Sequence, residues 1–547
     1  MFPETTHAVQ NQAEPRVNIN EFRTNTPLVE AVAAYVPDAA TTTLDEIGAH
    51  VGAETFQGAA ETVNIHTPVL HTHDRWGRRI DDVEFHPAYH DIMRESLSYG
   101  THSFGWTHAG GSAERAARFS LFAQIEPGHA CPVSMTHAAV PALMGTELED
   151  FWVPKLTSTV YDPRLIDPAE KQAATFGMAM TEKQGGSDVR ANTTVATPDG
   201  DHYLLTGHKW FCSAPQSDAF LVLAHLPEGL SCFLVPRVLP GGDRNPFFIQ
   251  RLKNKLGNKS NASSEIELHG THGWLVGEPG GGVRAIIEMV ARTRLDCVIG
   301  STAGMRQAVA EASWHASGRA AFGNTLIDQP LMRSVLADLQ LEAEAATWTM
   351  MHLAAAHDDD SADGQAFRRI ATAIAKYWIC KRGPAHAYEA LECLGGNGYT
   401  EDFPLARRYR EQPVLAIWEG SGNVIVLDVL RAMGREPHSV TALTTFLEGA
   451  LGVHANYDAR YEALKPRVQD TMKTLASHDA SAVAALQRAG RVLVEDLAVM
   501  LQAAILIHHA PTEIAESFAR ARLGGDRGMQ YGALPDGVAI DALIERA

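Results

Sequence analysis

Residues 180–188 read Met-Thr-Glu-Lys-Gln-Gly-Gly-Ser-Asp, a loop rich in glycines and hydroxyl side chains. Glycines let backbone N–H groups converge on an anionic oxygen, and Thr181 and Ser187 add hydroxyl donors. Residues 207–213, Gly-His-Lys-Trp-Phe-Cys-Ser, follow on a β-type run, where Trp210 could flank a planar ring system. Each segment alone is more typical of a surface turn or of core packing, so the interpretation depends on what surrounds it.

The residues around these segments have a β-type pattern. Short apolar runs separated by Gly, Pro, Asn and Asp predict a β-sandwich or barrel over 173–282. Before and after this block, apolar residues recur three and four positions apart, which is typical of packed helices. The chain is therefore predicted to be an α+β multidomain protein with an arm over 1–45, a helical domain over 46–172, the β-domain, a helical bundle over 283–436 and an extra helical domain over 437–547.

The composition argues against several classes of protein. Hydrophobic residues make up 45% and charged residues 20%, as in packed rather than disordered chains. The sequence lacks both a membrane-length apolar run and a basic-then-apolar leader, so a cytoplasmic location is expected. The six cysteines show no zinc-ligand spacing, and no metal is expected. A formal net charge of -19 disfavours nonspecific binding to nucleic acid.

One carboxylate stands out in residues 416–423, Ala-Ile-Trp-Glu-Gly-Ser-Gly-Asn, which lie before a predicted helix. Removing the proton next to a thioester carbonyl requires a base held beside that carbon. A carboxylate in a dry pocket has a raised pKa that suits this task. The alternative is that Glu419 only caps the following helix, since acidic residues favour helix N-termini. On these residues alone, the two roles are equally supported.

Together, these segments resemble the acyl-CoA dehydrogenase family, whose members carry a TE-x-x-x-GSD loop, a G-x-K-x-(W/F) strand and a (Y/W)-E-G-(T/S) signature. The resemblance continues in R-x-x-F-G at 319–323 and G-G-x-G-Y at 395–399. It implies a helical N-terminal domain, a middle β-domain and a helical bundle. It also implies an FAD-dependent α,β-dehydrogenation of an acyl-CoA thioester, with Glu419 as the base and hydride transfer to flavin N5. Some branches place the base within the stretch that here is 291–296, but no glutamate is present there.

The resemblance also implies a set of cofactor contacts. In the family, the segments that match 319–323 and 395–399 reach the FAD of a neighbouring subunit. At least a dimer is therefore expected, and a homotetramer built as a dimer of dimers. The FAD contacts implied in this way are Met180, Thr181, Gly186, Ser187, Trp210, Cys212, Ser213, Arg319, Phe322, Gln329, Gly395, Gly396, Gly398, Ile417, Trp418, Gly420, Ser421 and Asn423.

Two features, residues 74–87 and the extra helical tail, resemble the alkylation-response (AidB) branch of this family. That branch is associated with FAD, DNA binding and weak isovaleryl-CoA dehydrogenase activity. The alternative function is therefore a DNA-associated flavoprotein of the adaptive response to alkylation damage, with vestigial dehydrogenase activity. The tail is not basic overall, so the candidate contacts to double-stranded DNA are local arginines, namely Arg431, Arg522 and Arg527. An acyl-CoA oxidase is a third option, which differs chiefly in letting oxygen reach the reduced flavin.

Overall fold

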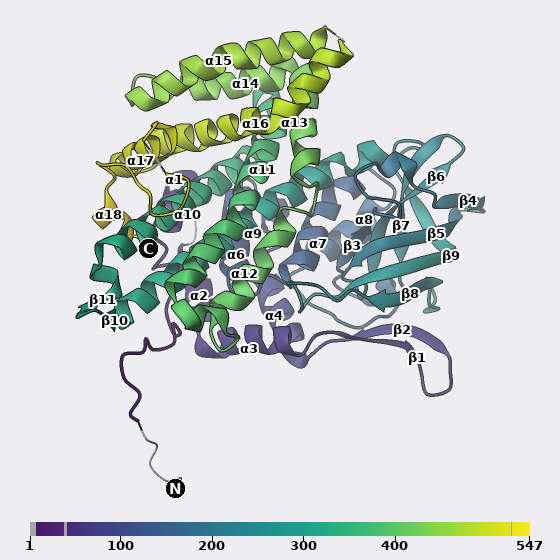
Figure 1. The fold of residues 1–547 in the computed structure, drawn as a ribbon. Helices are drawn as coiled ribbons and strands as arrows, with labels where there is room; N and C mark the ends of the chain where they lie inside the picture. The colour runs from purple at the N-terminus through teal and green to yellow at the C-terminus, as the bar shows by residue number, and fades with distance from the viewer. Residues whose placement is uncertain (1–6, 38–40, 478, 527) are drawn as a thin grey trace.

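The computed structural model describes residues 7–37, 41–477, 479–526 and 528–547, and it shows a helical body with a β-domain at one side (Figure 1). The first helices are α1 (Thr26–Tyr35), α2 (Thr41–Gly52), α3 (Glu54–Ile65), α4 (Pro87–Ser98), α5 (Phe104–Thr107), α6 (Ser112–Ala123), α7 (Ala130–Leu143) and α8 (Glu149–Leu156). The strands β1 (Val69–His73) and β2 (Arg79–Glu84) form a hairpin that projects from this domain along the β-domain.

The stretch expected to be an arm contains helix α1 and the start of α2. Asn25 accepts a hydrogen bond from the backbone N–H of Leu28, and Pro27 occupies the first turn, so the chain becomes helical here. Leu28 and Val32 are buried, and α1 packs against α10 (Pro330–Ala356). The extended arm is therefore shorter than expected and is defined here as residues 7–25.

The β-domain is a barrel made of β3 (Phe176–Ala179), β4 (Val195–Asp199), β5 (His202–Ser213), β6 (Ala219–Leu226), β7 (Gly229–Pro236), β8 (Phe247–Leu252) and β9 (Ser263–Val276). The pairings β6–β4, β4–β5, β5–β9, β9–β7 and β7–β6 form a closed ring. Phe220, Val222 and Phe233 are fully buried in its core. Short β-type runs separated by turn residues predicted this domain, and the structure confirms it.

Long helices form the second half of the body: α9 (Gly282–Gly318), α10, α11 (Ala362–Cys393), α12 (Pro404–Leu415) and α13 (Gly422–Arg435). A buried ion pair between Arg115 and Asp296 joins α6 to α9. A small hairpin, β10 (Ala320–Ala321) with β11 (Asn324–Thr325), connects α9 to α10. The Glu419 loop lies between α12 and α13, so its position is set by two helices of this bundle.

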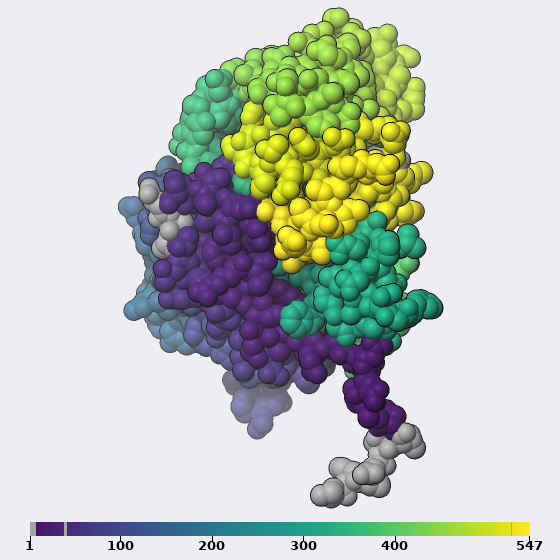
Figure 2. Space-filling view, turned by 90° about the vertical axis from the view of Figure 1, so that its left-hand side faces the viewer, coloured from purple at the N-terminus to yellow at the C-terminus, as the bar shows by residue number. Residues whose placement is uncertain are grey.

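The tail comprises α14 (Pro437–Glu448), α15 (Ala455–Ala476), α16 (Ala480–His509), α17 (Thr512–Phe518), a π-helical turn (Ala519–Leu523) and α18 (Ile540–Glu545). Helix α16 contacts α10, α11 and α13, and its apolar residues Leu493, Leu497 and Met500 are buried. Arg546 pairs with both Glu30 and Glu344. The N-terminal and C-terminal parts of the chain therefore share one face (Figure 2). No helix within the described ranges is long and apolar enough to cross a membrane.

Candidate active site

Glu182 of the first motif and Lys209 of the second form a fully buried ion pair. Lys209 Nζ lies 2.8 Å from Glu182 Oε1, and both side chains are 0% exposed. The Glu182 carboxylate also accepts from the backbone N–H groups and hydroxyls of Thr193 and Thr194. Burial alone would raise the pKa of Glu182, but the hydrogen bonds from Lys209 and Thr194 outweigh it and lower that pKa, so the carboxyl group is ionised. The pair ties the 180–188 loop to the barrel wall.

The same loop is hydrogen-bonded directly to strand β5. The backbone N–H of Trp210 donates to the carbonyl of Thr181 at 2.9 Å, and that of Lys183 donates to the His208 ring at 3.0 Å. A Cβ at Gly186 would lie 2.3 Å from Thr181 Oγ1, so this turn requires glycine. The structure therefore brings the two sequence motifs together, and the Ser187 residue at their edge is exposed.

The side chains of 210–213 point in different directions along β5. Trp210 is half-buried, and Lys253 Nζ lies 3.3 Å from the centre of its ring. Cys212 is fully buried in the barrel core, which argues against a cofactor contact through its thiol. Ser213 Oγ lies 3.3 Å from Ser263 Oγ and is half-buried. Met180, at the start of the loop, packs against the core between the barrel and α7 and is half-buried.

The Glu419 loop is held through its backbone by two cations. Glu419 has a φ of 57° and Gly420 a φ of 108°. A non-glycine residue in this left-handed region costs roughly 1–2 kcal/mol. Arg294 Nε of α9 donates to the Glu419 carbonyl at 3.1 Å, and Lys376 Nζ of α11 donates to the Gly420 carbonyl at 2.5 Å. Two helices therefore fix the strained turn that aims the Glu419 side chain.

The Glu419 carboxyl group is shielded from water, although the residue as a whole is half-buried. Burial raises its pKa, and the Thr293 hydroxyl bond and the charges of Arg294 and Lys376 offset only part of that effect. Thr293 lies in the 291–296 stretch, where other branches carry the base. The structure therefore places this stretch beside Glu419, but the side chain that the stretch contributes there is the Thr293 hydroxyl and not a carboxylate. The helix-cap alternative is wrong, because the N-cap of α13 is Ser421.

The residues that flank Glu419 differ in packing and in exposure. Trp418 packs against Cys131 and Met135 of α7 and Ala214 of the barrel, so it closes the seam between these domains. Ile417 is 63% exposed. The Ser421 residue is exposed, and its hydroxyl makes no capping bond to α13. Of these three residues, only Trp418 packs against the seam, whereas Ile417 and Ser421 are exposed.

Asn423, an expected FAD contact, already has a protein partner that the sequence did not reveal. Arg491 of α16 donates to Asn423 Oδ1 from Nε at 2.9 Å and from Nη2 at 2.7 Å. The extra tail therefore holds the first turn of the helix that follows the Glu419 loop. Helical periodicity can assign a residue to the polar face of a helix, but it cannot say which helix that face meets.

The segments expected to act on a neighbouring subunit lie away from the barrel. In Figure 1 the β10–β11 hairpin is at the opposite end of the body from the β-domain. Phe322 at its tip has a φ of 54° and is 98% exposed, while Gln329 Nε2 braces the hairpin through the Ala321 carbonyl at 3.0 Å. Arg319 at its base is half-buried. Within one chain, these residues do not join the Glu419 loop.

The glycine turn that ends α11 also presents an open surface. Gly395 has a φ of 59°, and no atom lies within 4 Å of a Cβ built at Gly395 or Gly396. Gly398, by contrast, packs so closely that a Cβ would lie 2.1 Å from the Leu391 carbonyl oxygen. Tyr399 is 88% exposed. Gly398 therefore shapes the turn, and the other two glycines leave it accessible.

The three arginines that are candidate contacts to DNA differ in their surroundings. Arg522 is buried, with 6% of its side chain exposed, and is paired with Asp338 at 2.5 Å and Glu342 at 3.0 Å. A guanidinium held in this way does not face the surface, which argues against a phosphate contact. Arg431 is 59% exposed and lies 3.3 Å from Asp428. Arg527 lies outside the described residues.

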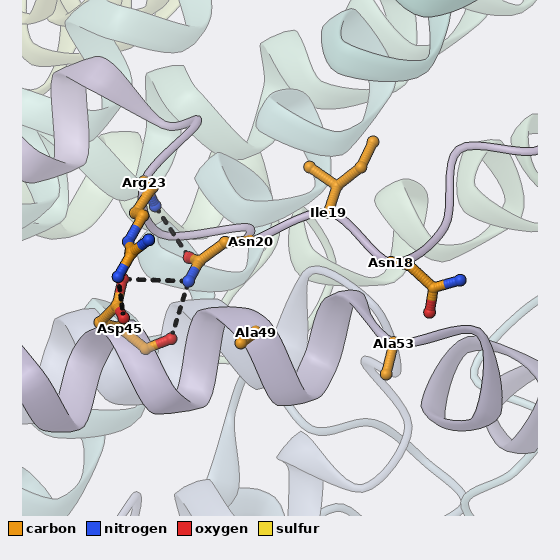
Figure 3. A pocket seen from close by; sticks show the side chains of 7 residues that line it. All are labelled: Asn18, Ile19, Asn20, Arg23, Asp45, Ala49 and Ala53. Carbon is orange, nitrogen blue, oxygen red and sulfur yellow. Dashed lines mark hydrogen bonds and ion pairs between the residues drawn. The ribbon is translucent and has the colours of Figure 1, made fainter.

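A surface hollow between the arm and α2 is separate from these segments. It is lined by Asn18, Ile19, Asn20, Arg23, Asp45, Ala49 and Ala53 (Figure 3). Asn20 Nδ2 donates to the backbone carbonyl and to the carboxylate of Asp45, each at 3.0 Å. Hydrogen bonds between the arm and α2 therefore account for the shape of the hollow. Nowhere in the described part of the chain do three or more His, Cys, Asp or Glu residues gather to hold a metal ion.

Comparisons with known proteins agree with this geometry. Residues 11–163 match the N-terminal domain of the adaptive response protein AidB, residues 177–271 the acyl-CoA dehydrogenase middle domain and residues 280–434 the acyl-CoA dehydrogenase C-terminal domain. AidB of Escherichia coli (strain K12) is 40% identical over 533 residues, 96% of each chain. The chain belongs to the acyl-CoA dehydrogenase family. Within the acyl-CoA dehydrogenase family it is AidB-like, as its sequence predicted.

Two solved structures show how far the acyl-CoA dehydrogenase fold extends along the chain. The Caenorhabditis elegans protein ACDH-11, solved in complex with C11-CoA, superposes with a TM-score of 0.83 at 25% identity and covers 100% of this chain and 93% of its own. Butyryl-CoA dehydrogenase of Megasphaera elsdenii gives a TM-score of 0.55 at 23% identity and covers 63% of this chain and 90% of its own. The second comparison shows the fold alone. The first also includes the tail.

Acyl-CoA dehydrogenase family members are FAD-binding flavoproteins, and the residues present here fit that cofactor. The loop that carries the exposed Ser187 is hydrogen-bonded to the strand that carries the half-buried Trp210, and it turns at Gly186, where a side chain would clash with Thr181. Phe322 and the Gly395 turn form a second exposed surface, away from the barrel.

Proposed function

We propose that this protein is an FAD-dependent acyl-CoA dehydrogenase in which Glu419 removes the α-proton of an acyl thioester. The observation that carries this function is the Glu419 carboxyl group, whose pKa is raised by burial and whose turn is fixed by Arg294 and Lys376. A general base works best when its pKa is close to the operating pH and its position is fixed. Burial moves the pKa of Glu419 upward, and Arg294 and Lys376 fix its turn.

The chain's own residues divide the work of the reaction. The Glu419 carboxylate accepts the proton from the carbon next to the thioester carbonyl, and the hydrogen bond from the Thr293 hydroxyl offsets part of the rise in its pKa that burial causes. Trp418 closes the seam between α7 and the barrel and so limits the access of water. The bound FAD would supply the acceptor for a hydride from the β-carbon. The product is an enoyl thioester.

The substrate class follows from the reaction and is supported by a relative. ACDH-11 was solved with C11-CoA, and it covers this whole chain. The test is anaerobic mixing of the yellow holoprotein with a panel of acyl-CoAs, followed by the flavin absorption. Bleaching by at least one acyl-CoA is expected, and a flavin that no member of the panel reduces would refute the dehydrogenase.

The same preparation separates the competing functions. Rapid consumption of oxygen during turnover would indicate an acyl-CoA oxidase. A gel shift with duplex DNA at two ionic strengths tests the alkylation-response alternative, because phosphate-driven binding weakens steeply with added salt. Tight, salt-sensitive binding without flavin reduction would favour DNA protection over dehydrogenation.

A second copy of the chain completes the cofactor site in this proposal. Phe322 is 98% exposed on a strained hairpin tip, and a large aromatic side chain in such a place is suited to burial in a partner. Phe322→Asp is expected to reduce the oligomer to smaller species and to lower FAD retention about tenfold or more. Light scattering and flavin content measure both effects.

The control for this variant is Met529→Asp, because Met529 is 100% exposed in the tail, far along the chain from the expected interface. It should leave assembly and flavin unchanged. If Phe322→Asp retained the wild-type oligomer with full flavin, this hairpin would not be part of a shared cofactor site.

A further inference from the structure

The arm crosses both segments that are expected to reach the cofactor of a neighbouring subunit. Asn11 is bound to the β10–β11 hairpin, and Gln12 lies beside the glycine turn that ends α11. Figure 2 shows the arm leaving the body beside the teal residues that include this hairpin. Residues 11–14 are therefore the segment that links the two.

The contact to the hairpin is specific in both side chain and backbone. Asn11 Nδ2 donates to the Ala320 carbonyl at 2.9 Å, and the Ala320 N–H donates to Asn11 Oδ1 at 2.6 Å, so the amide satisfies both backbone groups of Ala320. Arg319 Nη1 donates to the Asn11 carbonyl at 3.0 Å. Asn11 has a φ of 55°, a left-handed conformation that asparagine tolerates better than most residues and that presents this carbonyl to Arg319.

Three further contacts continue along the arm. Asn397 Nδ2 of the glycine turn lies 3.4 Å from Gln12 Oε1. A Cβ at Gly318 would lie 2.7 Å from Ala13 Cβ, so the arm backbone packs directly on the end of α9. Trp314 Nε1 of α9 donates to the Glu14 carbonyl at 2.7 Å. Each of the four arm residues therefore meets the body.

The arm is also anchored beyond these residues. Arg16 and Glu21 form a buried, two-point ion pair at 2.5 and 3.0 Å, and Gln57 Nε2 donates to the Arg16 carbonyl at 3.1 Å. Arg306 of α9 donates to the Thr24 carbonyl at 2.8 Å. With this part of the arm bound to α3 and α9, the position of Asn11 is set by the fold.

We infer that arm residues 11–14 are positioning residues of the shared cofactor site. They hold Arg319 and the glycine turn that ends α11 in place for the FAD of a neighbouring subunit. The inference rests on the proposed function. A free arginine side chain samples many rotamers, and ordering it on binding weakens affinity. The Asn11 carbonyl engages only one guanidinium nitrogen, so the remaining N–H groups of Arg319 stay available for the anionic diphosphate of FAD.

A double-mutant cycle on FAD affinity tests this inference in the full-length protein. The four proteins are the wild type, Asn11→Ala, Arg319→Ala and the double variant, and the dissociation constant of FAD is measured by flavin fluorescence. Asn11→Ala is expected to weaken FAD binding about tenfold, and adding it to Arg319→Ala should cause little further loss, because the arm acts through Arg319. Fully multiplicative losses, or an unchanged affinity in Asn11→Ala, would overturn the inference.

Two further variants control for folding and for the backbone. Asn11→Gly keeps the left-handed conformation and the carbonyl that meets Arg319, so it should bind FAD more tightly than Asn11→Ala. Arg23→Ala removes the Arg23–Asp45 pair of the same arm beside the hollow in Figure 3 and should leave FAD affinity unchanged. An equal loss in Arg23→Ala would show general loosening of the arm and would count against positioning.

The oligomeric state of each variant is measured alongside FAD affinity. If the flavin loss in Asn11→Ala came with dissociation into monomers, the arm would be an interface brace and the positioning role would be wrong. A wild-type protein that binds no flavin would instead refute the proposed function itself. The two failures are therefore distinguishable.

Discussion

Glu419→Gln is expected to retain FAD and the fold while flavin reduction by acyl-CoA falls by roughly 10²–10⁴-fold, the usual contribution of a general base. The amide keeps the shape of the carboxyl group and can still accept from Thr293, but it cannot take up the proton. Stopped-flow measurement of flavin bleaching under anaerobic conditions gives the rate directly. Bleaching at the wild-type rate would remove Glu419 from the mechanism.

The matched control is Glu411→Gln. Glu411 is also a buried carboxyl group, which accepts from the backbone N–H of Asn258 at 2.8 Å, and burial raises its pKa to about 7. It lies on α12 and is not one of the residues assigned to the reaction. Glu411→Gln should therefore leave bleaching close to wild type. A similar loss in both variants would mean that any change of a buried carboxyl group disturbs the protein.

The pH dependence of the wild-type rate follows from the same carboxyl group. A base must be deprotonated to act, and burial raises the pKa of Glu419 above its ordinary value. The rate should therefore rise with pH, and the acid limb should lie above the pH at which an exposed glutamate titrates. Thr293→Val removes a hydrogen bond that lowers this pKa, so the acid limb should move to still higher pH. A limb that stayed in place would show that another group sets it.

The order of domains and the β-barrel could be predicted because both depend on local patterns. Apolar residues alternate along a strand and recur three or four positions apart along a helix, because one side of each element is buried. Turn residues mark where each strand ends. The Glu419 loop and the 180–188 loop were likewise found as contiguous segments. What the sequence could not provide was the partner of each side chain across the fold.

Three residues illustrate that limit. Arg522 looked like a surface cation near the end of the chain, but its partners Asp338 and Glu342 are about 180 positions away. Arg491 meets Asn423 only because α16 folds back on α13. Cys212 has its thiol in the barrel core because successive side chains of a strand face opposite sides, and the register of β5 was not known.

The second large effect concerns stability: Lys209→Met is expected to lower the free energy of unfolding by roughly 3–5 kcal/mol, the range for breaking a buried ion pair from one side. The variant leaves the Glu182 carboxylate fully buried without its counter-charge. Because Glu182 holds the 180–188 loop on the barrel, flavin should be lost as well. Thermal unfolding and flavin content measure the two effects.

The double variant Glu182→Gln with Lys209→Met separates charge from packing. It removes both charges, so it should recover much of the stability lost in Lys209→Met. Lys473→Met breaks the exposed Lys473–Asp470 pair in the tail and should change stability by less than about 1 kcal/mol. A Lys209→Met variant that matched this control would show that the buried pair does not stabilise the loop.

The pH dependence of unfolding gives an independent check of the same pair. The pKa of Glu182 is lowered in the folded protein, so its contribution to stability is present above the unfolded pKa of a glutamate and is lost as pH falls below it. Lys209 supplies the largest of the interactions that lower this pKa. In Lys209→Met the acid-induced loss should therefore shrink, and the stability curves of the two proteins should converge as the pH is lowered. Parallel curves would mean that Lys209 acts by packing, and that the motif lysine does not hold the cofactor loop through its charge.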